Sequence, residues 1–394
     1  MKIGVPQETY PRERRVALTP DALPMLAKAG HAAVVQSGAG DQAGYPDRLY
    51  REKGAEIADS RAQVFRASDA IVQVRGLGAN PQAGRQDLEL MREGQIIIAQ
   101  LDPLWRIDSI QPLADRKVIA FALELMPRIT RAQTMDVLSS QATVAGYKAV
   151  LVAADTAPRM FPMLMTAAGT ITAAHVFVIG AGVAGLQAIA TSKRLGAIVK
   201  GYDVRPAVKE QVESLGAKFV EVGLETAAAE DKSGYAKDMG EEFIRKQREK
   251  LTEVVAESHV VITTAAIPGK KSPVLVTADM VARMLPGSII IDLAAERGGN
   301  CALTRPDETV VTNGVTVLGP TNLPGEVPFH ASQMYSRNVV SFVKEITRDG
   351  ALALSDENEI HRETLVTRGG DIAHPRIEQL LGSNPPPSGG GGRG

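Results

Sequence analysis

The sequence has little of several features that mark specialised classes of protein. Its 394 residues include one cysteine, Cys301, so an internal disulfide is excluded and a reducing compartment is indicated. Lys plus Arg (44) nearly balance Asp plus Glu (45), and the formal net charge of −1 does not favour nucleic acid or an anionic membrane surface as a partner. Aromatic residues are scarce, at 4% of the chain, whereas the 44% hydrophobic content is that of an ordinary globular protein.

Membrane, metal and common hydrolase signals are missing as well. No uncharged apolar run approaches the roughly 18 residues that a membrane-spanning helix needs, so we expect no direct membrane insertion. The opening residues, Met1 to Pro6, indicate a first strand and not a signal peptide. The six histidines show no metal-ligand spacing, so we expect no metal site, and neither a G-x-S-x-G elbow nor a P-loop occurs.

The first third of the chain alternates apolar strands with amphipathic segments. Residues 21–29 predict a helix that Gly30 terminates, and Gly38-Ala39-Gly40 is interpreted as a turn because no apolar helix follows it. This rhythm is typical of a parallel sheet covered by helices. The expected strands are 3–5, 33–36, 70–74, 95–99 and 118–120.

The most informative motif follows an apolar strand at 176–179. The sequence Gly180-Ala181-Gly182-Val183-Ala184-Gly185 opens an Ala- and Leu-rich helix, as in a dinucleotide-binding fingerprint. Gly180 permits the tight turn, Gly182 lets a pyrophosphate approach the backbone, and Gly185 lets the helix pack against the strand. The pyrophosphate would rest on the free N–H groups of the helix N-terminus. The alternative is a glycine-rich turn in another kind of α/β domain.

An acidic residue stands where such a motif requires one. The strand at 198–202 leads to Asp203, about 20 residues after the glycines, where a carboxylate can accept both ribose hydroxyls. A carboxylate repels a 2′-phosphate, so the sequence predicts NAD(H) in preference to NADP(H). Further strands are expected at 260–263, 288–291 and 315–318.

The length of the chain predicts two domains. Helices are expected at 135–154 and 332–343, on either side of the dinucleotide domain, and a long irregular insertion at 225–249. The Pro/Gly-rich residues 382–394 should be a disordered tail or a linker. We therefore predict an α/β fold with two Rossmann-like doubly wound parallel-sheet domains separated by a cleft. The expected domains are 1–136 plus 327–381, 137–326, and the tail 382–394.

Three polar segments outside the glycine motif could belong to a site. Residues 124–141 gather a cation, amides, a carboxylate and hydroxyls, which is either a ligand loop or a polar loop that caps the next helix. Glu8, Arg14 and Arg15 follow the first strand, where they form either an anion-binding loop or a solvated charge cluster, and we favour the solvated cluster. Residues 263–269 either line the dinucleotide site or form an ordinary strand exit, and Cys301 is interpreted as structural.

Several stretches together resemble the NAD(H)-binding component of proton-translocating transhydrogenase, in the alanine dehydrogenase/transhydrogenase superfamily. The resemblance covers roughly residues 1–343, and its most specific parts are the loop at 124–136 and the segment around Tyr235. The stretches that carry it are ELMPRITRAQ (124–133) with Met135-Asp136, MTAAGT (165–170), GVAGLQAIAT (182–191), KEQVESLG (209–216), GYAK (234–237), MGEE (239–242), IPGK (267–270) and GGNC (298–301).

This resemblance implies a subunit that binds NADH and passes hydride directly to NADP⁺ on a partner beta subunit. A membrane-embedded subunit would couple the reaction to proton movement, which implies a cytoplasmic chain held at the inner membrane by its partners. It also implies a homodimer. The implied catalytic residues are Arg128, Gln133 and Asp136, which with Ile129 and Ser139 hold the nicotinamide end. The other implied cofactor-binding residues are Gly180, Gly182, Val183, Ala184, Gly185, Asp203, Val204, Arg205, Gly234, Tyr235, Gln247 and Ala266.

The chief alternative is a free-standing NAD-dependent L-alanine dehydrogenase, which shares the fold and much of the N-terminal sequence. That enzyme needs a lysine and a histidine at its substrate, and here those positions are Arg75 and Asp102. Arginine stays charged and cannot shuttle a proton as lysine can. A third possibility is a regulatory NAD-binding module without hydride chemistry, which would have no need of the polar residues Arg128 to Asp136.

Overall fold

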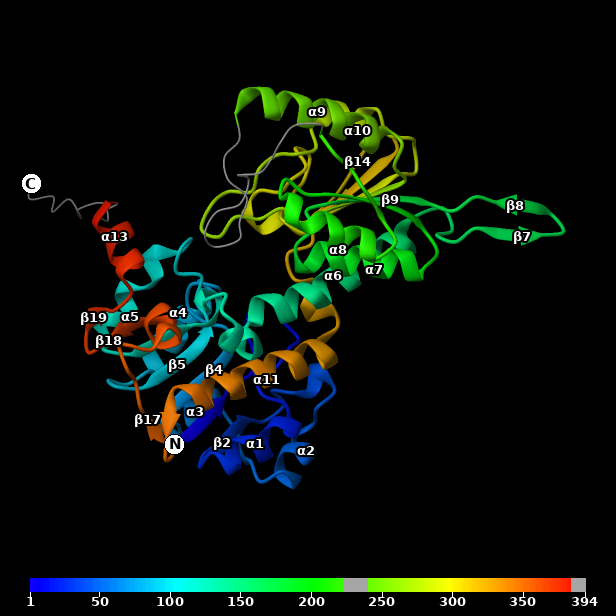
Figure 1. Cartoon of the computed structure of the whole chain (residues 1–394). Helices are drawn as coiled ribbons and strands as arrows, with labels where there is room; N and C mark the ends of the chain where they lie inside the picture. The colour runs from blue at the N-terminus through cyan, green and yellow to red at the C-terminus, as the bar shows by residue number, and fades with distance from the viewer. Residues whose placement is uncertain (223–239, 384–394) are drawn as a thin grey trace, which may run out of the picture. The chain divides into compact units, whose positions relative to one another are not determined.

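The computed structural model describes residues 1–222 and 240–383, except the side chains of Glu241 and Ser383. These residues form two compact units, which are described separately (Figure 1). The first unit comprises Met1–Gln141 and the described residues from Gly325 onward, and the second comprises Ala142–Pro324.

The first unit is built on an eight-stranded sheet in the order β19-β18-β6-β5-β4-β1-β2-β3. Strands β1 to β6 pair in parallel, and the late strands β18 and β19 add an antiparallel edge. The bounds are β1 Lys2–Val5, β2 Ala32–Gln36, β3 Glu56–Ala58, β4 Ala70–Arg75, β5 Ile96–Gln100, β6 Ile119–Ala122, β18 Leu365–Arg368 and β19 Asp371–Ile372.

Helices cover both faces of this sheet because successive strand residues point to opposite sides. Ile98 packs in one apolar cluster with the helix residues Leu26 and Val339, whereas Ile97 packs in the other with Phe65 and Leu113. The helices of this unit are α1 Leu23–Lys28, α2 Asp47–Glu52, α3 Arg61–Ala67, α4 Gly84–Leu90, α5 Gln111–Asp115, α11 Pro328–Glu345, α12 Glu359–Thr364 and α13 Pro375–Ser383.

The second unit has a seven-stranded sheet in the order β11-β10-β9-β12-β13-β15-β14, in which β14 alone runs antiparallel. Its two faces are covered by α6 with α7 and by α9 with α10 (Figure 1). The bounds are β9 His175–Ile179, β10 Ile198–Tyr202, β11 Lys218–Phe219, β12 Val260–Thr263, β13 Ile289–Asp292, β14 Thr309–Thr312, β15 Val315–Leu318, α6 Val137–Thr156, α7 Val183–Arg194, α8 Lys209–Ser214, α9 Glu241–Ala256 and α10 Ala278–Ala282.

Each sheet therefore has one place where the strand order reverses. In the first unit this switch point lies between β1 and β4, and in the second it lies between β9 and β12. Ligands of open α/β sheets bind outside the carboxyl ends of the strands at such a point. The predicted α/β class with largely parallel, doubly wound sheets is confirmed; the cleft between the domains stays a prediction.

Several expectations need correction. Residues 241–249 belong to helix α9, so the predicted irregular insertion is wrong there, and residues 225–239 lie outside the described residues. Residues 382 and 383 end helix α13, so the predicted disorder is wrong for these two residues, and residues 384–394 lie outside the described residues. The hairpin of β7 (Leu164–Thr166) and β8 (Gly169–Ile171) was not predicted, since its strands have only three residues each.

Among the described residues, α6 is the one helix that is long and apolar enough to cross a membrane by length and composition. The same test is passed by core helices, so it is weak support for a span. Helix α6 also carries Lys148 and Asp155, and its residues Ala149, Val150 and Ala153 are buried in the core of the second unit.

Candidate dinucleotide site

The glycine motif forms the turn from β9 into α7. Gly180 adopts a left-handed φ of +96°, and a Cβ there would lie 2.6 Å from the Thr264 hydroxyl. A Cβ on Gly185 would lie 1.8 Å from the carbonyl oxygen of Gly180, so only glycine lets the helix pack this closely. Gly182 precedes the first turn of α7 without a side-chain cap, and among the described residues no atom lies within 4 Å of its would-be Cβ. The space in front of the helix N-terminus is thus open to an anionic ligand.

Val183 is exposed at the start of α7, and Ala184 is partly buried beside it. Because the first N–H groups of a helix have no partner within the helix, these two residues offer donors at the open end. The predicted phosphate residues therefore lie together with them where the turn after β9 leads into the first turn of α7.

Asp203 follows β10 at the same end of the sheet, with its carboxylate already engaged. Its Oδ2 accepts hydrogen bonds from Ala181 N (2.8 Å) and from Arg205 Nη2 (2.9 Å). Its Oδ1 accepts from the backbone N and the Nε of Arg205, both at 2.9 Å. The side chain of Asp203 is only 7% exposed. Ribose hydroxyls could therefore reach this carboxylate only after the Arg205 guanidinium turns away, a feature that sequence reasoning did not predict.

Two more of the predicted residues lie close to this strand end. Gln247 on α9 donates from Nε2 to the Tyr202 hydroxyl (2.8 Å), and burial raises the pKa of Tyr202 to about 12. Val204 packs, partly buried, on the core beneath. Ala266 is exposed in the loop after β12. Gly234 and Tyr235 lie outside the described residues.

The predicted nicotinamide residues belong to the first unit. Thr130–Met135 forms a 3-10 helix (η5), and Asp136 then caps α6: Ser139 donates to it from the backbone N (2.9 Å) and from Oγ (2.6 Å). Arg128 and Gln133 have exposed side chains, and Ile129 is partly buried. The helix-cap interpretation of this segment is thus confirmed, and it leaves Gln133 available for a ligand.

Helix α11 packs against this segment. Asn338 Nδ2 donates to the carbonyl oxygen of Thr134 (2.8 Å), next to Gln133. Arg131 binds Glu345 Oε1 (2.6 Å) and Asn358 Oδ1 (2.8 Å). These supports were missed because their partners lie some 200 residues apart in the sequence and no local pattern links them.

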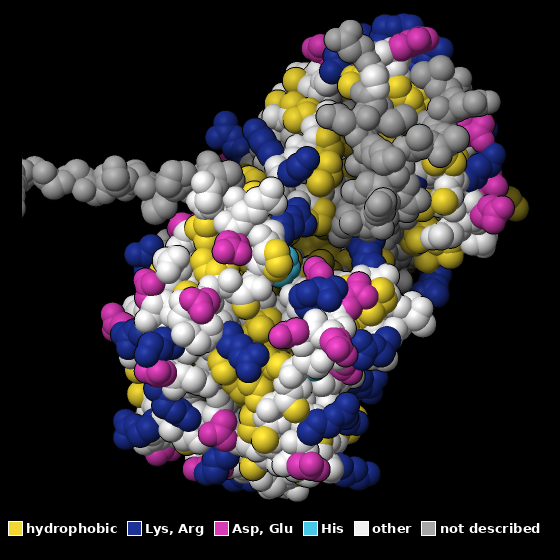
Figure 2. All heavy atoms as spheres, turned by 60° about the vertical axis from the view of Figure 1, so that its left-hand side comes forward, with side chains coloured by type: hydrophobic (Ala, Val, Ile, Leu, Met, Phe, Trp, Pro, Cys, Tyr) yellow, Lys and Arg dark blue, Asp and Glu magenta, His cyan; other side chains and the backbone are white. Residues whose placement is uncertain are grey.

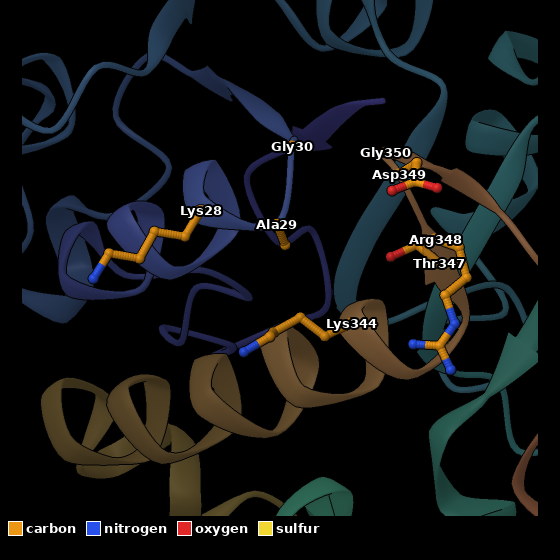
Figure 3. A pocket seen from close by; sticks show the side chains of 8 residues that line it. All are labelled: Lys28, Ala29, Gly30, Lys344, Thr347, Arg348, Asp349 and Gly350. Carbon is orange, nitrogen blue, oxygen red and sulfur yellow. The ribbon is translucent and has the colours of Figure 1, made fainter.

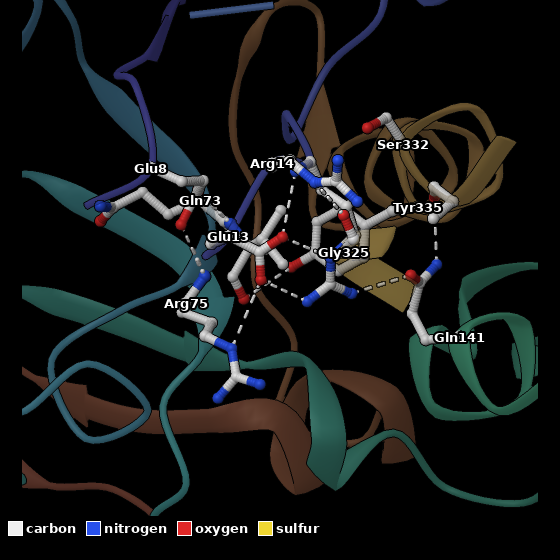
Figure 4. A network of polar contacts seen from close by, with 12 residues as sticks. Glu8, Glu13, Arg14, Gln73, Arg75, Gln141, Gly325, Ser332 and Tyr335 are labelled. Atoms are coloured by element: carbon white, nitrogen blue, oxygen red, sulfur yellow. Dashed lines mark hydrogen bonds and ion pairs between the residues drawn. The ribbon is translucent and has the colours of Figure 1, made fainter. Parts of the chain in front are cut away.

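At the switch point of the first unit lies a network of charged groups, which we name the ion cluster: Glu8, Glu13, Arg15 and Arg75 (Figure 4). Arg15 donates two hydrogen bonds to Glu13, from Nε to Oε1 (2.8 Å) and from Nη2 to Oε2 (2.6 Å). Its Nη1 donates a third to Oε1 of Gln141 (2.8 Å). Both side chains of the pair are at most 3% exposed. The predicted solvated charge cluster is therefore wrong for Arg15, whereas Arg14 is exposed and binds the carbonyl oxygen of Gly325.

Two carboxyl groups of this unit bind the backbone at strand ends. Glu8 accepts from Val74 N (2.6 Å) and Arg75 N (3.2 Å), and burial raises its pKa to about 7. Glu124 accepts from the backbone N of Leu101 (2.7 Å) and of Asp102, and burial likewise raises its pKa to about 7. Burial alone would raise the pKa of Glu13, but the Arg15 charge lowers it to about 2.

The positions that distinguish alanine dehydrogenase are used differently here. The Arg75 guanidinium lies over the Tyr10 ring at 4.3 Å from its centroid, and its Nε is 3.5 Å from Glu13 Oε2. Asp102 lies in a left-handed turn (φ 53°) whose N–H binds Glu124. The lysine and the histidine that an alanine dehydrogenase is expected to carry at these two positions are therefore replaced by an arginine and an aspartate.

Two shallow pockets are lined by residues of the first unit. One, of about 460 Å³, is lined by Lys28, Lys344 and Arg348 at the ends of α1 and α11 (Figure 3). The other, of about 680 Å³, runs along α11 past Arg131 and Met135. On the face shown in Figure 2, basic and acidic side chains are interspersed over both units. Within the described ranges, no three His, Cys, Asp or Glu residues gather as a metal site.

Comparison with known proteins identifies the family. The family model "Alanine dehydrogenase/PNT, N-terminal domain" matches residues 4–145, and "Alanine dehydrogenase/PNT, C-terminal domain" matches residues 149–375. In Rhodospirillum rubrum, the first polypeptide of NAD(P) transhydrogenase subunit alpha is 46% identical over 380 residues, which cover 96% of this chain and 99% of that protein. The alpha subunit of Cereibacter sphaeroides is 44% identical over 95% of this chain and 71% of its own length.

Solved structures agree. A transhydrogenase from Sinorhizobium meliloti matches with a TM-score of 0.82 and 40% identity, covering 95% of this chain and 100% of that one. An L-alanine dehydrogenase matches with a TM-score of 0.80 at 24% identity over 97% of this chain and 99% of its own, a likeness of fold alone. The chain therefore belongs to the alanine dehydrogenase/PNT family, and alpha subunits of NAD(P) transhydrogenase resemble it at 40–46% identity.

Proposed function

We propose that this chain is the NAD(H)-binding subunit of a proton-translocating NAD(P) transhydrogenase. The observation that carries the proposal is the second unit's switch point, where an open helix N-terminus and the acidic Asp203 stand at one sheet edge. These groups fit a dinucleotide: Gly182 leaves room for a pyrophosphate, and Asp203 can accept ribose hydroxyls once Arg205 releases it. The names of the relatives support the transhydrogenase assignment.

The adenosine half would lie on the second unit, with the pyrophosphate on Gly180, Gly182, Val183, Ala184 and Gly185. The proposed ribose and adenine contacts are Asp203, Val204, Arg205, Gln247, Ala266 and, outside the described residues, Gly234 and Tyr235. For the nicotinamide end we propose Arg128, Ile129, Gln133, Asp136 and Ser139. Asp136 already fixes Ser139, so this pair would present a preformed edge to the ribose.

The proposed chemistry asks little of ionisable side chains. Bound NADH supplies a hydride to the nicotinamide of NADP⁺ held by the partner beta subunit. Such a transfer needs close, oriented approach of two rings and no general acid or base. Arg128, Gln133 and Asp136 would therefore act by orienting the ring and its ribose. This requirement agrees with the lack of an acid–base pair at Arg75 and Asp102.

Assembly and location follow from the same proposal. Beta and membrane-embedded subunits would hold the chain on the cytoplasmic side of the inner membrane. The hairpin β7–β8 supports a homodimer: it extends from the second unit in Figure 1, and Met163 (60%), Met165 (76%) and Ile171 (44%) are strongly exposed. Two isolated strands are marginally stable in water, so such a hairpin gains from packing on a partner. We also propose that the two units correspond to the domains predicted from the sequence, 1–136 plus 327–381 and 137–326, although the unit borders fall after Gln141 and before Gly325.

The test mixes the purified chain with a transhydrogenase beta subunit and follows hydride transfer from NADH to bound NADP⁺. Turnover in the mixture and none with alanine plus NAD⁺ supports the proposal, whereas turnover with alanine alone establishes the dehydrogenase. The variant Gln133→Ala should bind NADH nearly as well as the wild type yet transfer hydride about tenfold to a hundredfold more slowly, because ring orientation is lost. Equal losses of binding and rate would mean that the loop only binds.

A further inference from the structure

The loop that follows β12 is fastened to the glycine motif of the second unit. Thr264 donates from its backbone N to the carbonyl oxygen of Ile179 (2.8 Å) and from Oγ1 to that of Gly180 (2.9 Å). The loop then continues through Ala265 to the exposed Ala266. The conformation of this loop therefore decides what is presented beside the phosphate-binding turn.

One side chain outside the loop holds its backbone. Asn300 is fully buried, at 0% exposure. Its Oδ1 accepts from Ala265 N (2.9 Å), and its Nδ2 donates to the carbonyl oxygens of Ala265 (2.8 Å) and Pro273 (2.8 Å). The amide thus binds both the N–H and the C=O of Ala265, as a neighbouring strand would. Only a group with a donor and an acceptor side by side can do this.

Asn300 is itself fixed to the carboxyl end of β13. Asp292 Oδ2 accepts from the backbone N of Asn300 (2.7 Å) and of Cys301 (2.9 Å), and from Thr304 Oγ1 (2.6 Å). The carbonyl oxygen of Asn300 accepts from the backbone N of residues 275 and 276. Gly299 makes this approach possible, since a Cβ there would lie 2.6 Å from Asp292 Oδ2.

We propose that Asn300 is a positioning residue for the dinucleotide site, acting through Ala265 on the loop that carries Ala266. The proposal rests on the proposed function, because it assumes that the glycine turn and this loop bind NAD(H). Asn300 makes no contact with the cofactor in this scheme. Its hydrogen bonds join the carboxyl end of β13 to the loop after β12. The ends of β9, β12 and β13 would thereby present one surface to the adenosine half.

The test replaces the amide with groups that cannot make the same contacts. Asn300→Asp cannot donate to the carbonyl oxygens of Ala265 and Pro273, and Asn300→Ser is uncharged but too short to bind both. Each variant should weaken NADH and ADP alike by about tenfold, the effect of losing one or two buried hydrogen bonds. Dissociation constants are measured by NADH fluorescence and ADP displacement at 15 °C, with thermal unfolding recorded in parallel.

The matched control is Asn80→Asp in the first unit. Asn80 is also buried (2% exposed) and donates to Thr9 Oγ1 (2.8 Å), but it lies in no proposed binding loop. It should lower the melting temperature without changing either dissociation constant. Folded Asn300 variants with unchanged dissociation constants would overturn the proposal, as would an effect seen with Asp and not with Ser, since that would reflect the new charge. A wild-type chain that does not bind NADH would instead overturn the proposed function.

Discussion

The two units have the same kind of sheet and use their switch points in opposite ways. In the second unit the first strand ends in glycines, and no described residue fills the space beside Gly182. In the first unit the loop after β1 carries Glu8 and Glu13, and their carboxylates bind the amide of Val74 and the guanidinium of Arg15. The first switch point is thus filled by carboxylates of the chain itself, where the second offers donors to a ligand.

The difference shows that a doubly wound sheet provides a place for a ligand but does not decide whether one binds. A buried charge must be neutralised by a partner, and in the ion cluster Glu13 pairs with Arg15 and Arg75, while the Glu8 carboxyl accepts from two backbone N–H groups. Side chains that satisfy one another gain nothing from a ligand. Donors at the start of α7 have no such internal partner from a cap, so binding energy remains for an anion.

The largest effect on the contrast between the filled and the open switch point is expected when Glu13 is removed from the ion cluster. In Glu13→Ala, Arg15 would stay buried without its carboxylate, and the free energy of unfolding of the first unit should fall by about 3–5 kcal/mol. Urea unfolding measures this loss. The exposed Glu52, which pairs with Arg48 on α2, is the control, and Glu52→Ala should cost less than about 1 kcal/mol. Similar losses for the two variants would mean that the ion cluster is not a buried, interdependent unit.

The open switch point can be blocked without disturbing the fold. Gly182 has φ −75° and ψ −168°, which alanine also adopts, and none of the described residues has an atom near its would-be Cβ. Gly182→Ala should change the free energy of unfolding by at most about 0.5 kcal/mol. Its methyl group would occupy the proposed pyrophosphate position. The dissociation constant of NADH should therefore rise about a hundredfold, which is a loss of about 2.7 kcal/mol of binding free energy.

Gly240 provides the matched control for that variant. It too precedes a helix, α9, with extended backbone angles and no side-chain cap, and within the described part of the chain no atom lies near its would-be Cβ. Gly240→Ala should leave both stability and NADH affinity unchanged. If it weakened NADH as much as Gly182→Ala does, the loss would not report on the glycine turn.

The sequence allowed the second switch point to be predicted and not the first, for a physical reason. The glycine motif is local: the strand, the turn and the helix lie within some 20 residues, and each glycine has its own steric role. The ion cluster is not local, since Arg15 contacts Gln141 across 126 positions and Glu8 contacts the backbone N of Val74 across 66. A charged run after a strand looks the same in sequence whether it is solvated or buried.

The same distinction between local and distant contacts explains which secondary-structure elements could be predicted from the sequence. Apolar runs of four to six residues, such as those of β4 and β12, were predicted because burial on both faces leaves a continuous hydrophobic signal. Strands β3 and β11 have three and two residues and leave no such signal. Asn300 was likewise not predicted as a support, because its partner Ala265 is 35 residues away.

The pH dependence of the free energy of unfolding should reveal the buried Glu8 of the ion cluster. The folded-state pKa of Glu8, about 7, lies above its ordinary value of 4.5. Between these values the folded state holds a proton that the unfolded state has lost, so stability falls as pH rises, at up to about 1.4 kcal/mol per pH unit. Glu124 acts in the same direction.

Glu8→Gln should remove one such contribution, and unfolding measured from pH 4.5 to 8 should show a shallower decline. Glu13 has the opposite sign: its pKa of about 2 means that its contribution is present above pH 4.5 and is lost as the pH falls toward 2. Glu56→Gln at the exposed Lys2 pair is the control and should leave the profile unchanged. A Glu8→Gln profile parallel to the wild type would contradict the assignment of this proton to Glu8.

The smallest expected effect concerns which dinucleotide the open site accepts. In the wild type, the Arg205 guanidinium binds the Asp203 carboxylate. Asp203→Ala removes this carboxylate, which would repel a 2′-phosphate, and leaves the guanidinium free to bind that phosphate. The ratio of NADPH to NADH dissociation constants should fall about tenfold, since an arginine beside the ribose can accommodate that phosphate. Asp203→Ala combined with Arg205→Ala should lose the gain for NADPH, because the cation that replaces the repulsion is gone. If the ratio stays the same in Asp203→Ala, the carboxylate serves only to hold Arg205 and Ala181, and selectivity arises elsewhere in the site.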